Sequence, residues 1–201
     1  MSTSISVYAV PLDQLTRVLG SRDRPLADAV AGKMSGWFAR IDKLADPDPD
    51  PDEPPVPTCS EALHRIIEGD LADVPGFHGY VYGYAFEALC AYLGEELEGI
   101  SAIAGSSEWI ETIDRWLDEA GVPLRLQDLV FGPGPVILPE PDDYPMIGHW
   151  PPEVIARSLG PIREVDLEGA DFETDGTVRQ IRDWVEFAAA RPGTGLIGCL
   201  S

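Results

Sequence analysis

Four residue types that can carry proton transfer or ligand binding come together in one short stretch, residues 142–150 (DDYPMIGHW). A carboxylate, a phenol, an imidazole and an indole in one loop could bind or act on a small molecule. We therefore select Asp143, Tyr144, His149 and Trp150 as candidate binding residues. The same stretch could instead be a loop that its aromatic rings anchor to the core, and the sequence leaves both interpretations open.

A second group of candidates lies earlier in the chain, where tyrosines alternate with glycines around residues 79–86. Tyr82 and Tyr84 could form an adaptable binding surface, because aromatic rings beside glycines suit such surfaces. Their other interpretation is core packing beside a tight turn. His64, on an expected helix over 60–68, completes the set of binding candidates.

None of the common catalytic or metal-binding signatures is present in the sequence. It lacks a glycine-rich phosphate loop, an HExxH zinc motif and a GxSxG nucleophile turn. Alternating aspartates follow residue 45, but an EF-hand loop needs glycine at its sixth position, where Pro51 stands. We therefore expect no catalytic residue, no metal site and no cofactor. Three scattered cysteines without a CxxC motif indicate buried, reduced thiols.

The elements that must position these candidates predict an α+β fold. Apolar residues at strand spacing occur over 5–10 and 196–200, and more weakly over 136–138 and 162–167. Helical spacing is clearest over 60–68, 107–121, 151–159 and 175–190. We expect a small, mostly antiparallel sheet that pairs the N- and C-terminal strands, packed with about five to six helices.

The length and composition favour one domain over residues 1–201. The 44% hydrophobic content is ordinary for a globular protein. Residues 46–57 (DPDPDPDEPPVP) alternate proline with carboxylates, which predicts a flexible, extended acidic loop within that domain. No apolar run is long enough to span a membrane, and no signal peptide is recognisable, so we expect a cytoplasmic location.

The charge is strongly negative and unevenly distributed. The net charge is −21, and residues 46–201 hold 31 acidic against eight basic residues. Such a surface repels nucleic acid and anionic lipid, and it attracts basic proteins. The sequence therefore predicts neither a nucleic-acid partner nor a membrane partner, and it makes a basic protein partner the natural one. The sequence contains no signal from which the oligomeric state can be predicted.

Two segments carry a resemblance to a known family. Residues 61–69 (EALHRIIEG) resemble the Leu-His helix of the YfbM-like family of uncharacterised proteins, and residues 146–159 (MIGHWPPEVIARSL) resemble that family's entry into a later helix. Actinobacterial proteins of unknown function are similar along the whole chain. The resemblance implies an α+β fold, no established reaction and no catalytic residues, and some relatives occur in toxin–immunity settings.

Two functions follow from these observations. The favoured one is an acidic binding protein, in its sharpest form an immunity-type stoichiometric inhibitor of a basic partner. The alternative is a small enzyme with a pocket near Tyr144, His149 and Trp150 that acts on a small molecule. The missing signatures favour the binding protein over the enzyme.

Overall fold

A computed structural model describes residues 3–44, 54–102, 107–139, 141 and 144–201. Asp143 and residues 46–53 of the acidic loop lie outside these described residues. Contacts divide the chain into two compact units. Unit 1 comprises Met1–Asp13, Gly94–Val136 and Met146–Ser201, and unit 2 comprises Gln14–Leu93 and Ile137–Pro145. A division by contacts does not define a folding domain, so the expectation of one domain stays a prediction.

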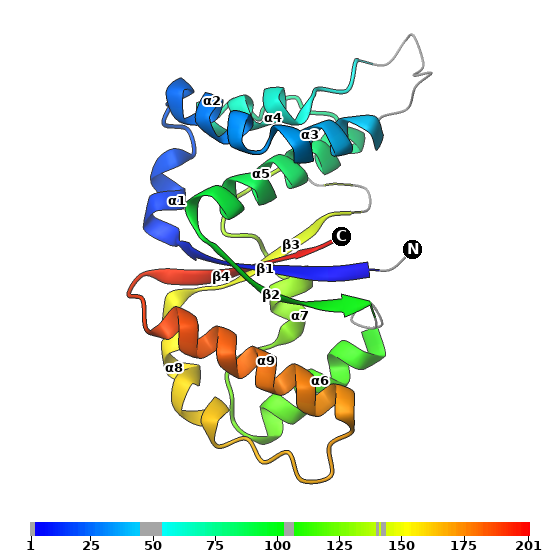
Figure 1. Ribbon diagram of the computed structural model, residues 1–201, viewed down its shortest axis with the longest axis vertical. Helices are drawn as coiled ribbons and strands as arrows, with labels where there is room; N and C mark the ends of the chain where they lie inside the picture. The colour runs from blue at the N-terminus through cyan, green and yellow to red at the C-terminus, as the bar shows by residue number, and fades with distance from the viewer. Residues whose placement is uncertain (1–2, 45–53, 103–106, 140, 142–143) are drawn as a thin grey trace. The chain divides into compact units, whose positions relative to one another are not determined.

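Unit 1 is built on a four-stranded antiparallel sheet with the order β2-β1-β4-β3. Its strands are β1 (Thr3–Pro11), β2 (Glu95–Ala102), β3 (Met146–Trp150) and β4 (Thr194–Leu200). The first and last strands lie side by side at the centre (Figure 1), with Ile5 opposite Leu200 and Pro11 opposite Thr194. The predicted α+β class and the predicted pairing of the terminal strands are confirmed.

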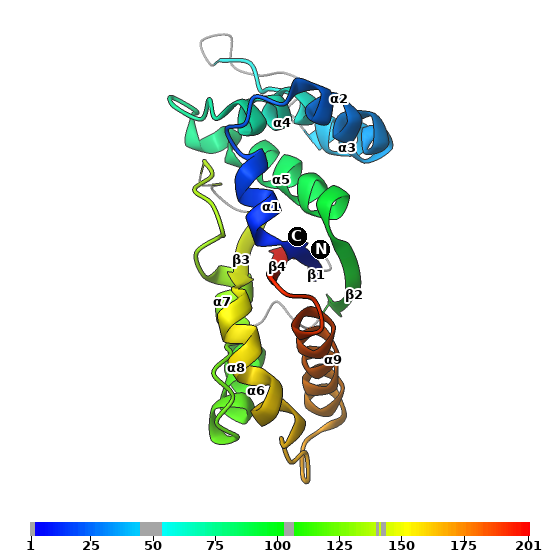
Figure 2. The ribbon, with the colours of Figure 1, turned by 90° about the vertical axis from the view of Figure 1, so that its left-hand side faces the viewer.

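Four helices cover one face of this sheet (Figures 1 and 2). They are α6 (Ser107–Glu119), α7 (Leu126–Phe131), α8 (Pro152–Arg163) and α9 (Phe172–Ala189). Alternate residues of β1, namely Ile5, Val7 and Ala9, enter the core that these helices form, as the two-residue period of a strand requires. The core of unit 1 therefore lies between the sheet and α6–α9.

Two glycines let α7 approach the sheet closely. Gly148 on β3 and Gly198 on β4 are paired across the strands, and a Cβ at either position would collide with the backbone of α7. The obstructing atoms include the Leu129 carbonyl oxygen, 2.6 Å from a Cβ at Gly148 and 2.5 Å from one at Gly198. Asp114 of α6 accepts hydrogen bonds from the first backbone N–H groups of α7, at Leu126 and Gln127.

The described part of unit 2 is helical. It contains α2 (Arg24–Lys33), α3 (Ser35–Ile41), α4 (Cys59–Glu68), α5 (Gly79–Leu93) and two short 3-10 helices (Asp42–Leu44 and Gly76–His78), while α1 (Leu12–Val18) continues into it from unit 1. α4 packs against α2 and α5. Thr58 and Glu61 form a capping box at the start of α4, and α4 confirms the helix predicted over 60–68.

Several sequence-based expectations differ from the structure. The described residues hold nine α-helices rather than about five to six, and α7 is among those that were not expected. Residues 136–138 form no strand, and residues 162–167 form the end of α8 and an irregular connection. The third and fourth strands are instead β2 and β3. The three cysteines are free and buried, as expected.

Candidate functional site

The candidates His64, Tyr82 and Tyr84 lie in unit 2, where they make contacts among its helices. His64 Nε2 lies 3.1 Å from Asp28 Oδ1. The Tyr82 side chain is fully buried, its hydroxyl accepts a hydrogen bond from Arg65 Nη1 at 2.8 Å, and burial raises its pKa. The ring of Tyr84 meets Trp37 edge to face with centroids 5.8 Å apart. These contacts tie α4, α5, α2 and α3 together.

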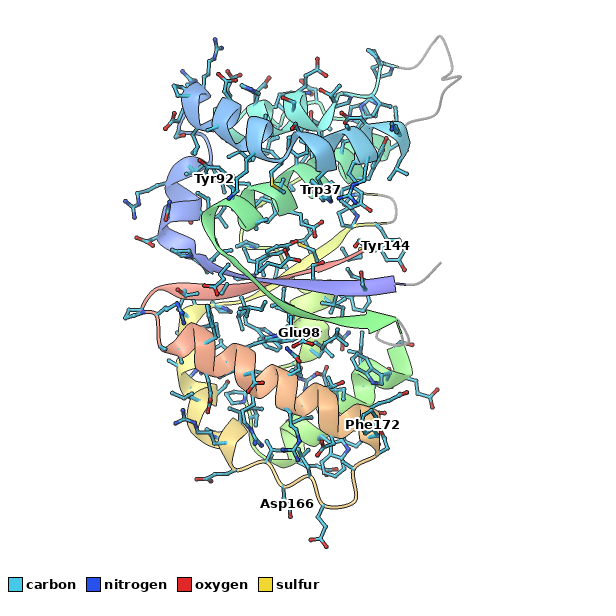
Figure 3. All side chains as sticks on the ribbon, in the orientation of Figure 1. Trp37, Tyr92, Glu98, Tyr144, Asp166 and Phe172 are labelled. Carbon is cyan, nitrogen blue, oxygen red and sulfur yellow. The ribbon has the colours of Figure 1, made fainter. Side chains whose placement is uncertain are left out.

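The described candidates of residues 142–150 belong to different units. Trp150 is 1% exposed, and its indole N–H donates to the Arg125 carbonyl at 2.8 Å, so it belongs to the core of unit 1. His149 precedes it on β3, and neighbouring strand residues point to opposite faces. Tyr144 belongs to unit 2 and is 39% exposed; Figure 3 labels it. Asp143 lies outside the described residues.

His149 has one ring nitrogen fixed by the backbone. Its Nδ1 lies 2.7 Å from the Pro133 carbonyl oxygen. Because a carbonyl only accepts, Nδ1 must carry the proton of the neutral ring, and Nε2 is left as an acceptor. Such a ring could accept a proton or bind a metal. However, the described residues contain no group of three or more histidine, cysteine or acidic side chains placed to hold a metal ion.

One surface depression of about 490 Å³ lies in unit 2, lined by Arg22, Arg24, Glu68 and Asp70. Its carboxylates already have cationic partners: Arg24 Nε contacts Glu68 Oε1 at 2.8 Å, and Arg65 Nε lies 3.6 Å from Asp70 Oδ2. Arg22 donates its backbone N–H to the Ile67 carbonyl at the end of α4. These links join the loop before α2 to α4, which explains the depression as part of the packing.

The acidic residues of unit 1 are placed differently. Unit 1 holds 19 acidic and seven basic residues. Two of its arginines are engaged within the unit, Arg163 with Glu186 at 2.6 Å and Arg179 with Asp175 at 2.7 Å. Many other carboxylates of the unit are exposed and make no ion pair in the described structure, among them Glu108, Glu111, Asp118 and Glu119 on α6 and Glu164, Asp166, Glu168 and Glu173 before and at the start of α9.

Sequence reasoning missed Phe172, the first residue of α9. Its side chain is 92% exposed, although the rest of α9 buries a regular apolar stripe through Val178, Ile181 and Val185. A signal was present. At 100° per residue, position 172 lies roughly opposite that stripe, so the helix pattern itself places this aromatic ring outside the core.

One comparison with known proteins identifies a family. The model of a domain of unknown function (DUF7691) matches residues 1–201. No curated protein and no solved structure matches the chain. The resemblance to YfbM-like and actinobacterial proteins stays a prediction. Within the described residues, no helix combines the length and apolar character that crossing a membrane requires.

Proposed function

The chain belongs to the DUF7691 family, whose description names no activity, and we propose from the residues themselves that it is an acidic binding protein for a basic protein partner. In its sharpest form it is an immunity-type inhibitor that covers a cationic face of its partner one to one. We place this activity in the cytoplasm, which is consistent with three free, buried cysteines. Nucleic acid and membrane lipid are not its partners.

The observation that carries this proposal is the set of unpaired, exposed carboxylates on unit 1. If arginines neutralised these carboxylates within the fold, they would exert little force on a partner. Instead, Glu108, Glu111 and Asp118 of α6 and the acidic residues before α9 face solvent without an ion pair in the described structure. Charge of one sign over one surface speeds association with an opposite charge and sets its orientation.

The test is capture of a partner at two ionic strengths followed by kinetics on the purified pair. The immobilised chain is exposed to an extract of its native host at about 50 mM and about 500 mM salt, conditions that differ strongly in screening length. We expect a basic protein to bind at low salt and its association rate to fall about tenfold or more at high salt. A stoichiometry of one to one supports the inhibitor form.

A variant with four fewer negative charges on α6 tests whether the carboxylates of unit 1 drive association. Replacing Glu108, Glu111, Asp118 and Glu119 by their amides keeps side-chain size on an exposed helix face and removes four negative charges. We expect slower association and a weaker salt dependence. A tight partner that is acidic, or whose association rate ignores salt in both proteins, overturns the proposal.

His149 is the observation that favours the second candidate, a small enzyme. Its Nδ1–H···O=C contact with Pro133 leaves Nε2 free to act as a general base. A fragment screen by NMR tests it, with His149→Asn as the matched variant, because the asparagine amide nitrogen takes the position of Nδ1 and can still donate to the Pro133 carbonyl. Fragments that shift the imidazole signals and are turned over only by the wild type support the enzyme; no bound fragment near His149 dismisses it.

A further inference from the structure

Phe172 is the most exposed aromatic side chain among the described residues, and nothing in the fold of unit 1 uses its ring. The remaining exposed phenylalanine of this unit, Phe131, keeps about half its surface covered, with 47% exposed. A phenylalanine ring left in water is unfavourable, because apolar surface gains free energy when it leaves water. Figure 3 shows Phe172 at the start of α9, with Asp166 on the connection that leads into the helix.

The backbone beneath Phe172 is fixed. The Asp171 carboxylate accepts from the Thr174 backbone N–H at 2.8 Å and from the Thr174 hydroxyl at 2.9 Å. Thr174 is 1% exposed and Val178 is fully buried, so the first turn of α9 is anchored both by its cap and by the core. The ring is therefore presented from a preorganised turn, which lowers the entropy lost on binding.

Helix formation alone does not explain a phenylalanine at this position. A hydrophobic staple joins the residue before the N-cap to the fourth helical residue, and those positions are Ala170 and Asp175. Phe172 takes no part in such a pair. Four residues on, where a side chain would lie beside the ring, the chain has Gly176, and a Cβ there would meet nothing within 4 Å. Its own helix thus leaves this side of the ring uncovered.

The charge of the segment that leads into α9 limits the kind of partner that can cover the ring. Residues 164–175 contain six acidic residues and no basic one. The flanking cations Arg163 and Arg179 are engaged with Glu186 and Asp175. A second copy of this chain would bring like charges together, whereas lysines and arginines around an apolar pocket would pair with these carboxylates as the ring is buried.

We propose that Phe172 with Glu164, Asp166, Glu168 and Glu173, called here the Phe172 surface, is the docking site for the basic partner, and that Phe172 is the anchor. The ring enters an apolar pocket whose rim carries lysine or arginine, and the four carboxylates contact that rim. An aromatic anchor at the centre with weaker polar contacts around it is how binding energy is distributed in many protein interfaces. This inference rests on the proposed function and assigns it to one surface.

The experiment uses a photoreactive phenylalanine analogue as the probe, placed in the full chain at position 172, or at position 131 as the control, in native host cells. We expect an adduct with one basic protein from position 172 and none from position 131. With that protein purified, Phe172→Ala should weaken binding about 30-fold, the value of a typical hot spot. Phe131→Ala should change binding less than about threefold.

A second variant separates loss of the anchor from loss of folding. Gly176→Leu keeps Phe172 but places a side chain beside its ring, and a Phe–Leu pair at this spacing stabilises helices. We expect a more stable protein that binds its partner about tenfold more weakly, because the ring is already covered. Phe172→Trp should keep most of the binding. Weaker binding by a more stable Gly176→Leu protein is not expected if Phe172 merely supports the fold.

The outcomes distinguish this inference from the proposed function. One outcome is a basic partner that binds with a salt-dependent rate, crosslinks at another position and binds Phe172→Ala as tightly as wild type. In that case the proposed function stands, and the assignment of the docking site to the Phe172 surface is wrong. If position 172 yields no adduct, the inference also fails. If the adduct is a second copy of the chain or an acidic protein, both fail.

Discussion

The two units use their charged residues in opposite ways. In unit 2, cations join elements to one another: Arg65 binds the Tyr82 hydroxyl and the Asp70 and Ala72 carbonyls, and Arg24 binds Glu68. In unit 1, apolar packing and the close approach of α7 to Gly148 and Gly198 hold helices to the sheet, and many carboxylates are left to solvent. This difference indicates that cations in unit 2 are part of its packing, whereas many carboxylates of unit 1 face solvent.

The largest effect is expected where unit 1 depends on the absence of a side chain. Gly198→Ala places a Cβ 2.5 Å from the Leu129 carbonyl oxygen, and a backbone atom cannot move aside as a side chain can. We expect a loss of about 3 kcal/mol in the free energy of unfolding. Urea unfolding followed by tryptophan fluorescence measures it well, because four of the five tryptophans lie in unit 1.

A control on the same strand sharpens this prediction. The three atoms nearest to a Cβ at Gly195 all belong to the Leu12 side chain, with Cδ1 at 2.7 Å, and that side chain can rotate away. Gly195→Ala should therefore lose about 1 kcal/mol, near the lower end for overpacking. Equal losses of stability at both glycines would mean that unit 1 does not depend on the close approach of α7 to the sheet.

The second largest effect is expected from removing an arginine that joins two helices. Arg65→Ala leaves the fully buried Tyr82 hydroxyl without its cationic donor and removes two bonds to backbone carbonyls. We expect a loss of about 2 kcal/mol, the cost of a buried polar group left unpaired. Hydrogen exchange read by peptide should locate the weakened protection in α4 and α5.

The matched substitution in unit 1 is Arg163→Ala. Arg163 also joins two helices, with Nε 2.6 Å from Glu186 Oε1, but its side chain is 56% exposed. An exposed ion pair is worth about 1 kcal/mol or less, so the loss should stay below that value. If Arg163→Ala costs as much as Arg65→Ala, the contrast between the units is wrong.

The sequence specified the parts of this fold that depend on local or periodic signals. The capping box at Thr58 and Glu61 and the strands at both ends were predictable, because short-range hydrogen bonding and two-residue alternation determine them. β2 was missed because EELEGISA has three glutamates, which are rare in strands; it forms by pairing with the distant β1. α7 was missed because its six residues are stabilised by Asp114 and by the two sheet glycines, which are contacts between distant segments.

The candidate site divides in the same way. Trp150 and Tyr82 were selected by residue type, and residue type does not separate a ring in the core from a ring on the surface. Both are buried. Phe172 lies outside the apolar stripe of α9 and was predictable from helical geometry, but its full exposure depends on which side of α9 meets the sheet and α6. That choice is made by tertiary packing.

A smaller effect is expected in the pH dependence of stability. Two helix-capping carboxylates, one in each unit, contribute to it with opposite signs. In unit 2, the Thr58 backbone N–H and hydroxyl lower the pKa of Glu61. In unit 1, burial raises the pKa of Asp114 despite its bonds to α7. Glu61 therefore stabilises the fold above its unfolded pKa, about 4.3, and this is lost as pH falls through the lower folded pKa. For Asp114, the stabilisation is full below about 3.9 and is lost as pH rises through the raised folded pKa.

The measurement is the stability of wild type against Glu61→Gln and Asp114→Asn at neutral pH and near pH 4. On acidification, wild type should lose stability relative to Glu61→Gln and gain it relative to Asp114→Asn, each by less than about 1 kcal/mol. Changes of the same sign for both pairs would contradict the distinction between an exposed capping carboxylate in unit 2 and a partly buried one in unit 1.

The smallest effect tests whether α9 is optimised for stability. Gly176 lies inside the helix with open space around it, and a glycine there is less stable than alanine by roughly 0.5–1 kcal/mol. Gly176→Ala should raise the stability of unit 1 by about that amount in urea unfolding, and Gly32→Ala in α2 of unit 2, equally open, should give the same gain. Equal gains would mean that the two glycines have the same effect on helix stability and differ only in that Gly176 lies one helical turn from Phe172. A fall in partner binding for Gly176→Ala alone would then mean that this glycine is kept for the uncovered ring of Phe172, because a gain in helix stability cannot itself weaken a rigid docking surface.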